Sequence, residues 1–364
     1  MTSRVLSLRR QFTTFNDTSQ EGLRQFFAWL ETRYGGLVWD TGPAAEVIQA
    51  QHDITAHDLG RLLRHEATAL HVKQFFPKRA AAALGRQLAA EVAAGGGQNW
   101  KVSTSRGLES SDVATLGAHP PFNVAAAHGA AGMAQYFDAV PLELRQRRQL
   151  DNANDDGQEQ QQQPALWPLD LLRLALDEVW PAGAGLARDE TRQRVYSGGL
   201  PRVMQGPTRW KRGYIHVDEM GPLNPANGLF SANIYLQLPS DDNDNGEQQQ
   251  QRQQQQTDGQ NDNHDTADAE QDILQIWPLG IRSRWDWYRN ALLLSGLSSQ
   301  DAADQARLRH QLGKPTILRG QPGDLILLCV QRPHAAVGFS SGIRVSLQCF
   351  LQHKGPKERL LIDS

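Results

Sequence analysis

The stretch PGDLILLCVQRPHAAVGFSSGIRVSLQCFL, residues 322–351, contains two apolar runs that are typical of β-strands. The runs 323–330 and 342–351 are short, rich in Leu, Ile and Val, and bounded by Gly and Pro. Proline, glycine and serine in the connection between them interrupt any regular helix. The stretch therefore predicts two strands near the end of the sequence.

The same pattern extends through the second half of the chain, where further strands are predicted at 213–219, 229–239 and 273–279. The first part differs, because its apolar residues recur at helical spacing and Thr55 and Pro77 stand where helices begin. Helices are predicted at 19–34, 54–67, 77–97 and within 286–312, with a strand at 69–76 and extended structure from 100. A helical shell around antiparallel strands predicts a mainly β fold with a jelly-roll core of two sheets.

Two segments, 151–164 and 240–271, consist largely of Gln, Asn and Asp and nearly lack apolar residues. Such segments bury too little apolar surface to offset the entropy of ordering, so we expect two disordered insertions. The rest of the chain divides into an N-terminal helical region, 1–68, a β domain, 69–351, and a C-terminal tail, 352–364.

The composition argues against two classes of partner. The chain has 364 residues, a formal net charge of −3 and no basic stripe among aromatic residues, so no nucleic-acid partner is expected. No apolar run is long enough to span a membrane, and the first residues lack the apolar core of a secretion signal. We expect a cytoplasmic protein, with organelle targeting as the alternative because no acid precedes Asp17. The sequence does not define the oligomeric state.

The two cysteines, Cys329 and Cys349, each lie inside an apolar run. This placement predicts two reduced thiols in the core rather than a disulfide or a metal site.

The run YIHVDEMG, residues 214–221, places two metal-binding side chains on one strand face. Alternate residues of a strand point the same way, so His216 and Asp218 project together. His334 follows the predicted strand 323–330 and offers a second imidazole. Two imidazoles and one carboxylate occupy one face of an octahedral Fe(II) and leave the other face open. His-x-Asp alone is also the pattern of a solvated strand face, so other residues are needed to distinguish a metal site from such a face.

Arg344 lies ten residues after His334 and shares a strand face with Ser346 and Gln348. An arginine that points between two sheets needs an anionic partner, because an unpaired buried charge is costly. A carboxylate co-substrate would supply that partner, bound by the guanidinium and the Ser346 hydroxyl. A second polar row in an apolar strand is typical of a pocket wall and consists of Ser231, Asn233 and Tyr235.

Together, His216-x-Asp218, His334 and Arg344-x-Ser346 resemble the motif of the Fe(II)/2-oxoglutarate-dependent dioxygenase superfamily. The resemblance implies that the two histidines and the aspartate bind iron. It also implies that Arg344, helped by Ser346, holds the distal carboxylate of 2-oxoglutarate.

The resemblance covers 69–351, and the strand and helix at 70–91 are similar to the corresponding part of prolyl-4-hydroxylase-like members. It implies a double-stranded β-helix, the cupin-like form of the jelly roll, and a co-substrate contact from Asn233 or Tyr235. The implied reaction hydroxylates an unactivated C–H bond of a small substrate, while O₂ and 2-oxoglutarate are converted and succinate and CO₂ are released.

The stretches 99–117 and 216–236 are similar to a group of amino-acid halogenases and hydroxylases. Halogenases of that group carry Gly or Ala at the position of Asp218, so Asp218 implies hydroxylation, with a free amino acid as substrate. The predicted substrate contacts are Arg106, Glu109 and Trp277. The alternative for the polar run 103–113 is a solvent-facing loop, and the alternative for Trp277 is the core.

Two other functions use the same residues. A non-catalytic protein on the same barrel would bind 2-oxoglutarate or another small molecule without turnover. A zinc enzyme of cupin type would use the three metal ligands but would leave Arg344 without a role.

Overall fold

The computed structural model describes residues 45–104, 107–118, 121–149, 166–239, 270–283 and 301–364, with the single residues 25, 29, 286, 290 and 297. The helix predicted at 19–34 and both predicted insertions, apart from residues 270 and 271, lie outside this part. Within the described residues, no helix combines the length and the hydropathy that a membrane crossing requires.

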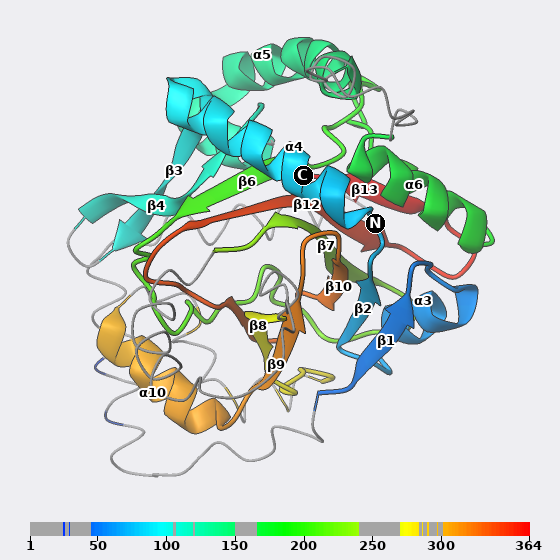
Figure 1. Ribbon diagram of the computed structural model, residues 1–364. Coiled ribbons are helices and arrows are strands. Elements are labelled where there is room, and N and C mark those ends of the chain that lie inside the picture. The colour runs from blue at the N-terminus through cyan, green and yellow to red at the C-terminus, as the bar shows by residue number, and fades with distance from the viewer. Residues whose placement is uncertain are drawn as a thin grey trace, which may run out of the picture.

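Strands make up the centre of the molecule and helices lie around them (Figure 1). The elements up to the middle of the chain are β1 (Val47–Gln51), α3 (Ala56–Leu63), β2 (Ala69–Lys73), α4 (Lys78–Glu91), η1 (Val92–Gly96), β3 (Gln98–Thr104), β4 (Gly107–Thr115), α5 (Pro121–Gln149) and α6 (Pro168–Val179). The later elements are β5 (Ala184–Leu186), β6 (Leu200–Gln205), β7 (Gly228–Gln237), β8 (Gln271–Ile276), α10 (Ala302–Leu312), β9 (Thr316–Gly320), β10 (Leu325–Cys329), β11 (His334–Ala336), β12 (Ile343–His353) and β13 (Leu360–Asp363).

The strands form a 10-stranded and a 3-stranded sheet. The large sheet has the order β1-β2-β10-β7-β12-β6-β4-β3, while β13 pairs with β12 and β5 pairs with β13; the small sheet has the order β11-β8-β9. From β6 onward the chain passes back and forth between the sheets: β6, β7, β10 and β12 belong to the large sheet, and the strands between them belong to the small one. The predicted mainly β fold with a helical shell is therefore present, while the described strands form no closed barrel.

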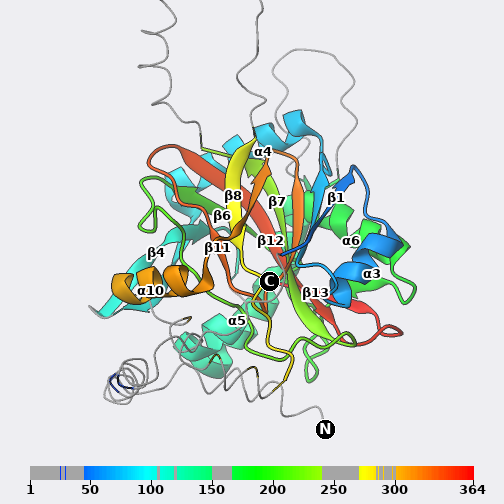
Figure 2. The same cartoon turned by 90° about the horizontal axis from the view of Figure 1, so that it is seen from below.

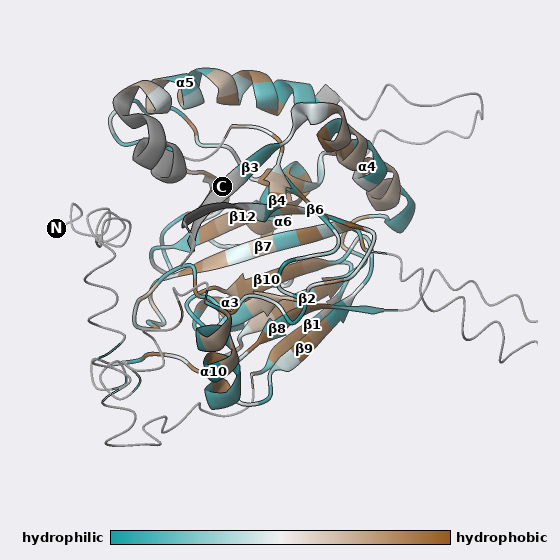
Figure 3. Ribbon diagram, turned by 90° about the vertical axis from the view of Figure 1, so that its left-hand side faces the viewer, coloured by the Kyte–Doolittle hydropathy of each residue, from teal (hydrophilic) through white to brown (hydrophobic). Residues whose placement is uncertain are grey.

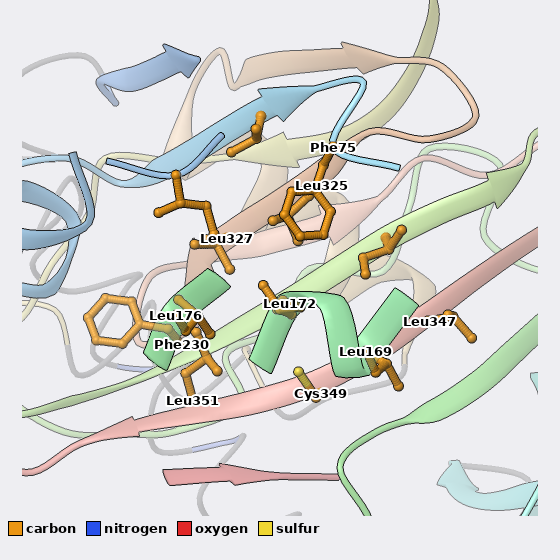
Figure 4. Packing of buried hydrophobic residues seen from close by; sticks show 14 of the residues in the cluster. Phe75, Leu169, Leu172, Leu176, Phe230, Leu325, Leu327, Leu347, Cys349 and Leu351 are labelled. Carbon is orange, nitrogen blue, oxygen red and sulfur yellow. The ribbon is translucent and has the colours of Figure 1, made fainter. Parts of the chain in front are cut away.

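The two faces of the large sheet pack against different partners. In β12, Val345, Leu347 and Cys349 are at most 1% exposed and lie in the cluster that also contains the apolar residues of α3, α4 and α6. Figure 4 shows Leu169 of α6 near Leu347 and Cys349 of β12. On the opposite face, Ile326 of β10 packs against Ile276 of the small sheet. The inter-sheet space is thus lined by the alternate residues of each strand; the central strands are largely hydrophobic in Figure 3.

Helix α10 covers the outer face of the small sheet, on the side of the molecule away from α6 (Figure 2). Asp301 begins the helix by accepting a hydrogen bond from the Ala303 N–H at 2.8 Å. Leu308 and Leu312 then pack against Ile215, which comes directly before His216. Helix α10 therefore supports the segment that carries two of the predicted metal ligands. This segment, predicted as a strand at 213–219, forms only the single bridge between His216 and His334.

Two helices in the first part form as the sequence predicts. Thr55 caps α3, because its hydroxyl accepts the Asp58 N–H at 3.1 Å. Helix α4 starts after Pro77, and Gly95, with φ of 91°, ends the helical segment that continues from it. Both helices place their apolar face on the large sheet.

Several segments differ from the expectation. Strand β1 lies within the predicted helical region 1–68 and pairs in parallel with β2. The predicted tail, 352–364, contains β13, whose register pairs it with both β12 and β5. Within the polar run 103–113, residues 103–104 belong to β3 and residues 107–113 to β4, and Gln271 already belongs to β8. Strands β1 and β13 are short, and their pairing partners β2 and β5 lie elsewhere in the sequence, whereas β3 and β4 pair with each other.

Candidate metal centre

Backbone hydrogen bonds bring the two predicted histidine ligands together. His216 and His334 form an antiparallel bridge, in which each N–H donates to the other residue's carbonyl oxygen at 3.0 Å. The Asp218 N–H donates to the carbonyl oxygen of Val330, also at 3.0 Å. Ile215 and Ala335 point into the α10 cluster, so the alternate residues His216 and His334 face the large sheet.

The ligand atoms of His216, Asp218 and His334 all lie within 4.8 Å of one another. His216 Nε2 is 3.5 Å from Asp218 Oδ1, and His334 Nε2 is 3.6 Å from Asp218 Oδ2. The imidazole of His334 is 7% exposed, whereas His216 and Asp218 are 32% and 25% exposed. The three groups therefore converge on one point that solvent or a ligand can reach from one side.

Each imidazole is oriented by a hydrogen bond to a carbonyl oxygen two residues earlier. His216 Nδ1 donates to Tyr214 at 3.0 Å, and His334 Nδ1 donates to Arg332 at 2.9 Å. A protonated Nδ1 leaves the Nε2 lone pair free, which is the arrangement that metal-binding histidines require. The ring of Tyr214 also stacks on that of His216, with centroids 5.3 Å apart.

The charge states of the triad suit a divalent cation. Burial, with the nearby His334, lowers the pKa of His216 to about 4, so its imidazole is neutral at pH 7. Burial alone would raise the pKa of Asp218, but the hydrogen bond from His334 and the surrounding positive charges lower it to about 2. A neutral imidazole and an ionised carboxylate are the forms that bind metal.

Arg344 is 4% exposed, and its Nε and Nη1 atoms have no hydrogen-bond partner. Its guanidinium lies over the ring of Phe339, 4.9 Å from the centroid, and burial lowers its pKa. Ser346 stands opposite Tyr235 on the neighbouring strand, on the face that looks into the inter-sheet space. The predicted anion site is thus a buried guanidinium with unsatisfied donors beside a hydroxyl and a phenol.

The other predicted polar residues fall in two groups. Asn233 lies on the same face of β7, opposite Gln348, and donates to the Ser231 hydroxyl at 3.2 Å. Trp277 is fully buried under α10, and its Nε1 donates to the Gly313 carbonyl oxygen at 3.0 Å, which makes it a core residue rather than a substrate contact. The two remaining predicted substrate contacts are Glu109, whose backbone lies in β4, and Arg106, which lies outside the described residues.

The structure adds Arg202 to the site, which the sequence reading did not single out. Arg202 lies on β6 directly opposite Ser346, and its Nη1 donates to the side-chain oxygen of Gln348. The signal in the sequence is that Arg202 is the one charged residue of this strand, LPRVMQ, and stands between Pro201 and Val203.

The two cysteines are reduced and buried, as predicted. Burial raises the pKa of both thiols, to about 11 for Cys329. Neither thiol is therefore a ligand or a nucleophile at neutral pH.

No protein-family model and no curated protein matches the chain, but solved structures do. An N-substituted L-amino acid dioxygenase from Burkholderia ambifaria AMMD, in complex with α-ketoglutarate, is 16% identical over 65% of this chain and 71% of that one, with a TM-score of 0.36. The non-heme α-ketoglutarate-dependent carbocyclase SnoK, from nogalamycin biosynthesis, is 13% identical over 86% and 99%, with a TM-score of 0.38. A prolyl-4-hydroxylase from Pseudomonas putida is 13% identical over 83% and 99%, with a TM-score of 0.33.

Proposed function

We propose that the protein is an Fe(II)- and 2-oxoglutarate-dependent dioxygenase that hydroxylates a small substrate. The observation that carries this proposal is the combination of the triad with the buried Arg344. A metal site alone would be satisfied by His216, Asp218 and His334. The unpartnered Nε and Nη1 of Arg344 require in addition an anion that enters the same inter-sheet space.

The fold supports the same function. In the large sheet, β10, β7, β12 and β6 lie in that order; along the chain, β8 and β9 of the small sheet come between β7 and β10, and β11 comes between β10 and β12. We infer that these strands form a double-stranded β-helix, the jelly roll found in cupins. In that arrangement the metal ligands come from the small sheet and the anion-binding residues from the large sheet, so they face each other.

The donor set fits iron better than the other common metals. Two imidazoles and one carboxylate, with open positions, are typical of non-heme Fe(II), whereas a structural zinc site uses four ligands and often Cys. His216 and His334 would bind through Nε2, and Asp218 through a carboxylate oxygen. When bound, the iron supplies the activation of O₂ that the hydroxylation of an unactivated C–H bond requires.

The protein's own residues bind the co-substrate, orient the metal ligands and neutralise the charge of the bound carboxylate. Arg344 would bind the distal carboxylate of 2-oxoglutarate by donating two parallel hydrogen bonds, with the Ser346 and Tyr235 hydroxyls as further donors. Tyr214 keeps the His216 ring in place by stacking on it. Asp218 completes the ligand set, and with its carboxylate present we expect hydroxylation rather than halogenation.

The substrate that we expect is a small molecule, with a free amino acid as the first class to test. Glu109 and Arg106 stay candidate substrate contacts, because β4 pairs with β6, the strand that carries Arg202.

The test is anaerobic reconstitution of the full-length protein with Fe(II) and 2-oxoglutarate. We expect a metal-to-ligand charge-transfer band, then O₂-dependent succinate, and with the correct amino acid a product heavier by one oxygen. His216→Ala should lose all three signals, and the exposed Asp272→Ala should keep them. Binding of 2-oxoglutarate without succinate would favour the non-catalytic binding protein, and zinc without the band would favour the zinc enzyme of cupin type.

A further inference from the structure

A second guanidinium faces the inter-sheet space beside the metal site. Arg202 on β6 stands opposite Ser346 on β12, and Ser346 stands opposite Tyr235 on β7. Residues that face each other across antiparallel strands project from the same side of the sheet. Val203, the next residue on β6, is buried in the cluster with the helices, so Arg202 points the other way, toward the small sheet.

Arg202 has a neutral partner where most buried arginines have a carboxylate. Its Nη1 donates to Gln348 Oε1, and the described residues offer it no ion pair. Arg147 shows the usual arrangement, because both of its terminal nitrogens bind the Glu91 carboxylate. Burial lowers the pKa of Arg202, while the nearest negative charge to act on it is that of Asp218. Asp218 is committed to the metal, so it cannot serve as a full counter-ion for Arg202.

The charges of the loaded site leave this guanidinium in excess. Fe(II) carries two positive charges, and Asp218 and 2-oxoglutarate carry one and two negative charges. Arg344 supplies one positive charge, so these four groups cancel, with both histidines neutral. The charge of Arg202 then has no counterpart, although a partly buried charge is stable only when it is paired. One further anion beside the metal would complete the balance.

We propose that Arg202, held in place by Gln348, binds a carboxylate of the substrate, so that the enzyme acts on a carboxylate-bearing small molecule. This proposal rests on the dioxygenase function proposed above and adds the substrate class. A guanidinium binds a carboxylate through two parallel N–H donors, which fixes the direction as well as the position of the substrate. One Arg202 nitrogen is occupied by Gln348, which sets the plane of the fork and leaves the other donors for the ligand.

The competing role for Arg202 is a contact with the metal-side carboxylate of 2-oxoglutarate itself. In both roles the Arg202 guanidinium binds a carboxylate. The roles differ in which ligand, the substrate or 2-oxoglutarate, loses affinity when the charge of Arg202 is removed. Calorimetric titration of the Mn(II)-loaded, full-length protein separates them, because Mn(II) takes the same ligands without turnover. The probes are 2-oxoglutarate alone and then, on the protein saturated with 2-oxoglutarate, the L-amino acids and their primary amides.

For the wild type we expect at least one amino acid to bind while its amide, which lacks the carboxylate charge, binds at least ~10-fold more weakly. Arg202→Met should weaken the acid by roughly 30-fold or more and erase the preference for the acid over the amide. The same variant should leave the affinity for 2-oxoglutarate within about twofold, because Arg344 is intact. Arg202→Lys should restore part of the acid's affinity, since it keeps the charge but not the fork.

Three results would overturn the proposal: a loss of 2-oxoglutarate affinity in Arg202→Met like that in Arg344→Met, equal binding of acids and amides to the wild type, or no binding by any acid of the panel. Failure of the wild type to bind 2-oxoglutarate at all would instead refute the dioxygenase function. Near-ultraviolet circular dichroism of Arg202→Met, with the exposed Arg319→Met as a matched control, shows whether the variant is folded.

Discussion

Replacing Arg344 by methionine should have opposite effects on stability and on ligand binding. In the absence of ligand, Arg344 is a buried charge whose Nε and Nη1 lack acceptors. Methionine has a similar length and no charge, so Arg344→Met removes the unsatisfied donors with little change in volume. The variant should therefore unfold less readily than the wild type in buffer with chelator, and it should bind 2-oxoglutarate far more weakly.

The structure sets the size of both effects. A buried donor without a partner costs about 1–3 kcal/mol, and Arg344 has two of them. The contact of the guanidinium with the Phe339 ring returns about 1 kcal/mol, so the free energy of unfolding should rise by about 1–5 kcal/mol. Loss of a buried, hydrogen-bonded charge pair costs about 2–5 kcal/mol, so the dissociation constant for 2-oxoglutarate should rise about 30-fold or more.

The assay is guanidinium denaturation of both proteins in chelator, followed by calorimetric titration with 2-oxoglutarate in the presence of Mn(II). Arg319→Met is the matched control, because that arginine is exposed and pairs with Asp272; it should change neither quantity appreciably. A destabilised Arg344→Met protein that still binds 2-oxoglutarate like the wild type would refute the assignment, since Arg344 would then be a structural residue with an internal partner.

Three further predictions follow from the site and its supports. Asp218→Ala should lower the affinity for Mn(II) at least ~10-fold in calorimetry, with secondary structure unchanged by circular dichroism. Asp324 accepts a hydrogen bond from His71 at 2.9 Å, both side chains being nearly inaccessible, so Asp324→Ala should lower the free energy of unfolding by about 3–5 kcal/mol. Burial would raise the pKa of Asp324, but its hydrogen bonds lower it overall. The carboxylate therefore contributes its full stabilisation above the unfolded pKa of about 4, and this stabilisation is lost as the pH falls below that value. Asp324→Asn should reduce the loss of stability at low pH, as measured by denaturation at several pH values. Gly213→Ala would place a Cβ 2.5 Å from a β11 carbonyl oxygen at φ of +82° and should weaken Mn(II) binding, whereas Gly313→Ala, which meets no atom within 4 Å, should only destabilise the fold.

The alternation of residues along strands is what made the site predictable from the sequence. A period of two assigns each side chain to a face without any knowledge of the strand's partners. It correctly placed His216 with Asp218, and Arg344 with Ser346 and Gln348. The distance of ten residues between His334 and Arg344 then suffices for a turn that carries the chain from one sheet to the other.

The features that the sequence did not predict depend on pairing across long separations. Strand β1 follows a stretch of helical periodicity, and only its parallel pairing with β2 makes it a strand. The segment 352–364 is too short and too polar at its start to indicate a strand, yet Leu360 and Ile362 are buried between β12 and β5. Arg202 was overlooked for the same reason, because its role depends on the register of β6 against β12.

The same alternation explains why the anion site persists when no anion is bound. Val345 and Leu347 flank Ser346, are fully buried, and fix the rotation of β12 against the helices. Turning Arg344 out to solvent would turn these two residues out as well, at a cost of about 1.5–3 kcal/mol each. That cost, about 3–6 kcal/mol in total, offsets the roughly 1–5 kcal/mol that escape of the guanidinium would recover, so the charge stays in place and the site is preorganised. Ligand binding then needs no rearrangement of the strand, and the satisfied guanidinium should make 2-oxoglutarate a strong stabiliser: a concentration 100 times the dissociation constant raises the free energy of unfolding by about 2.7 kcal/mol.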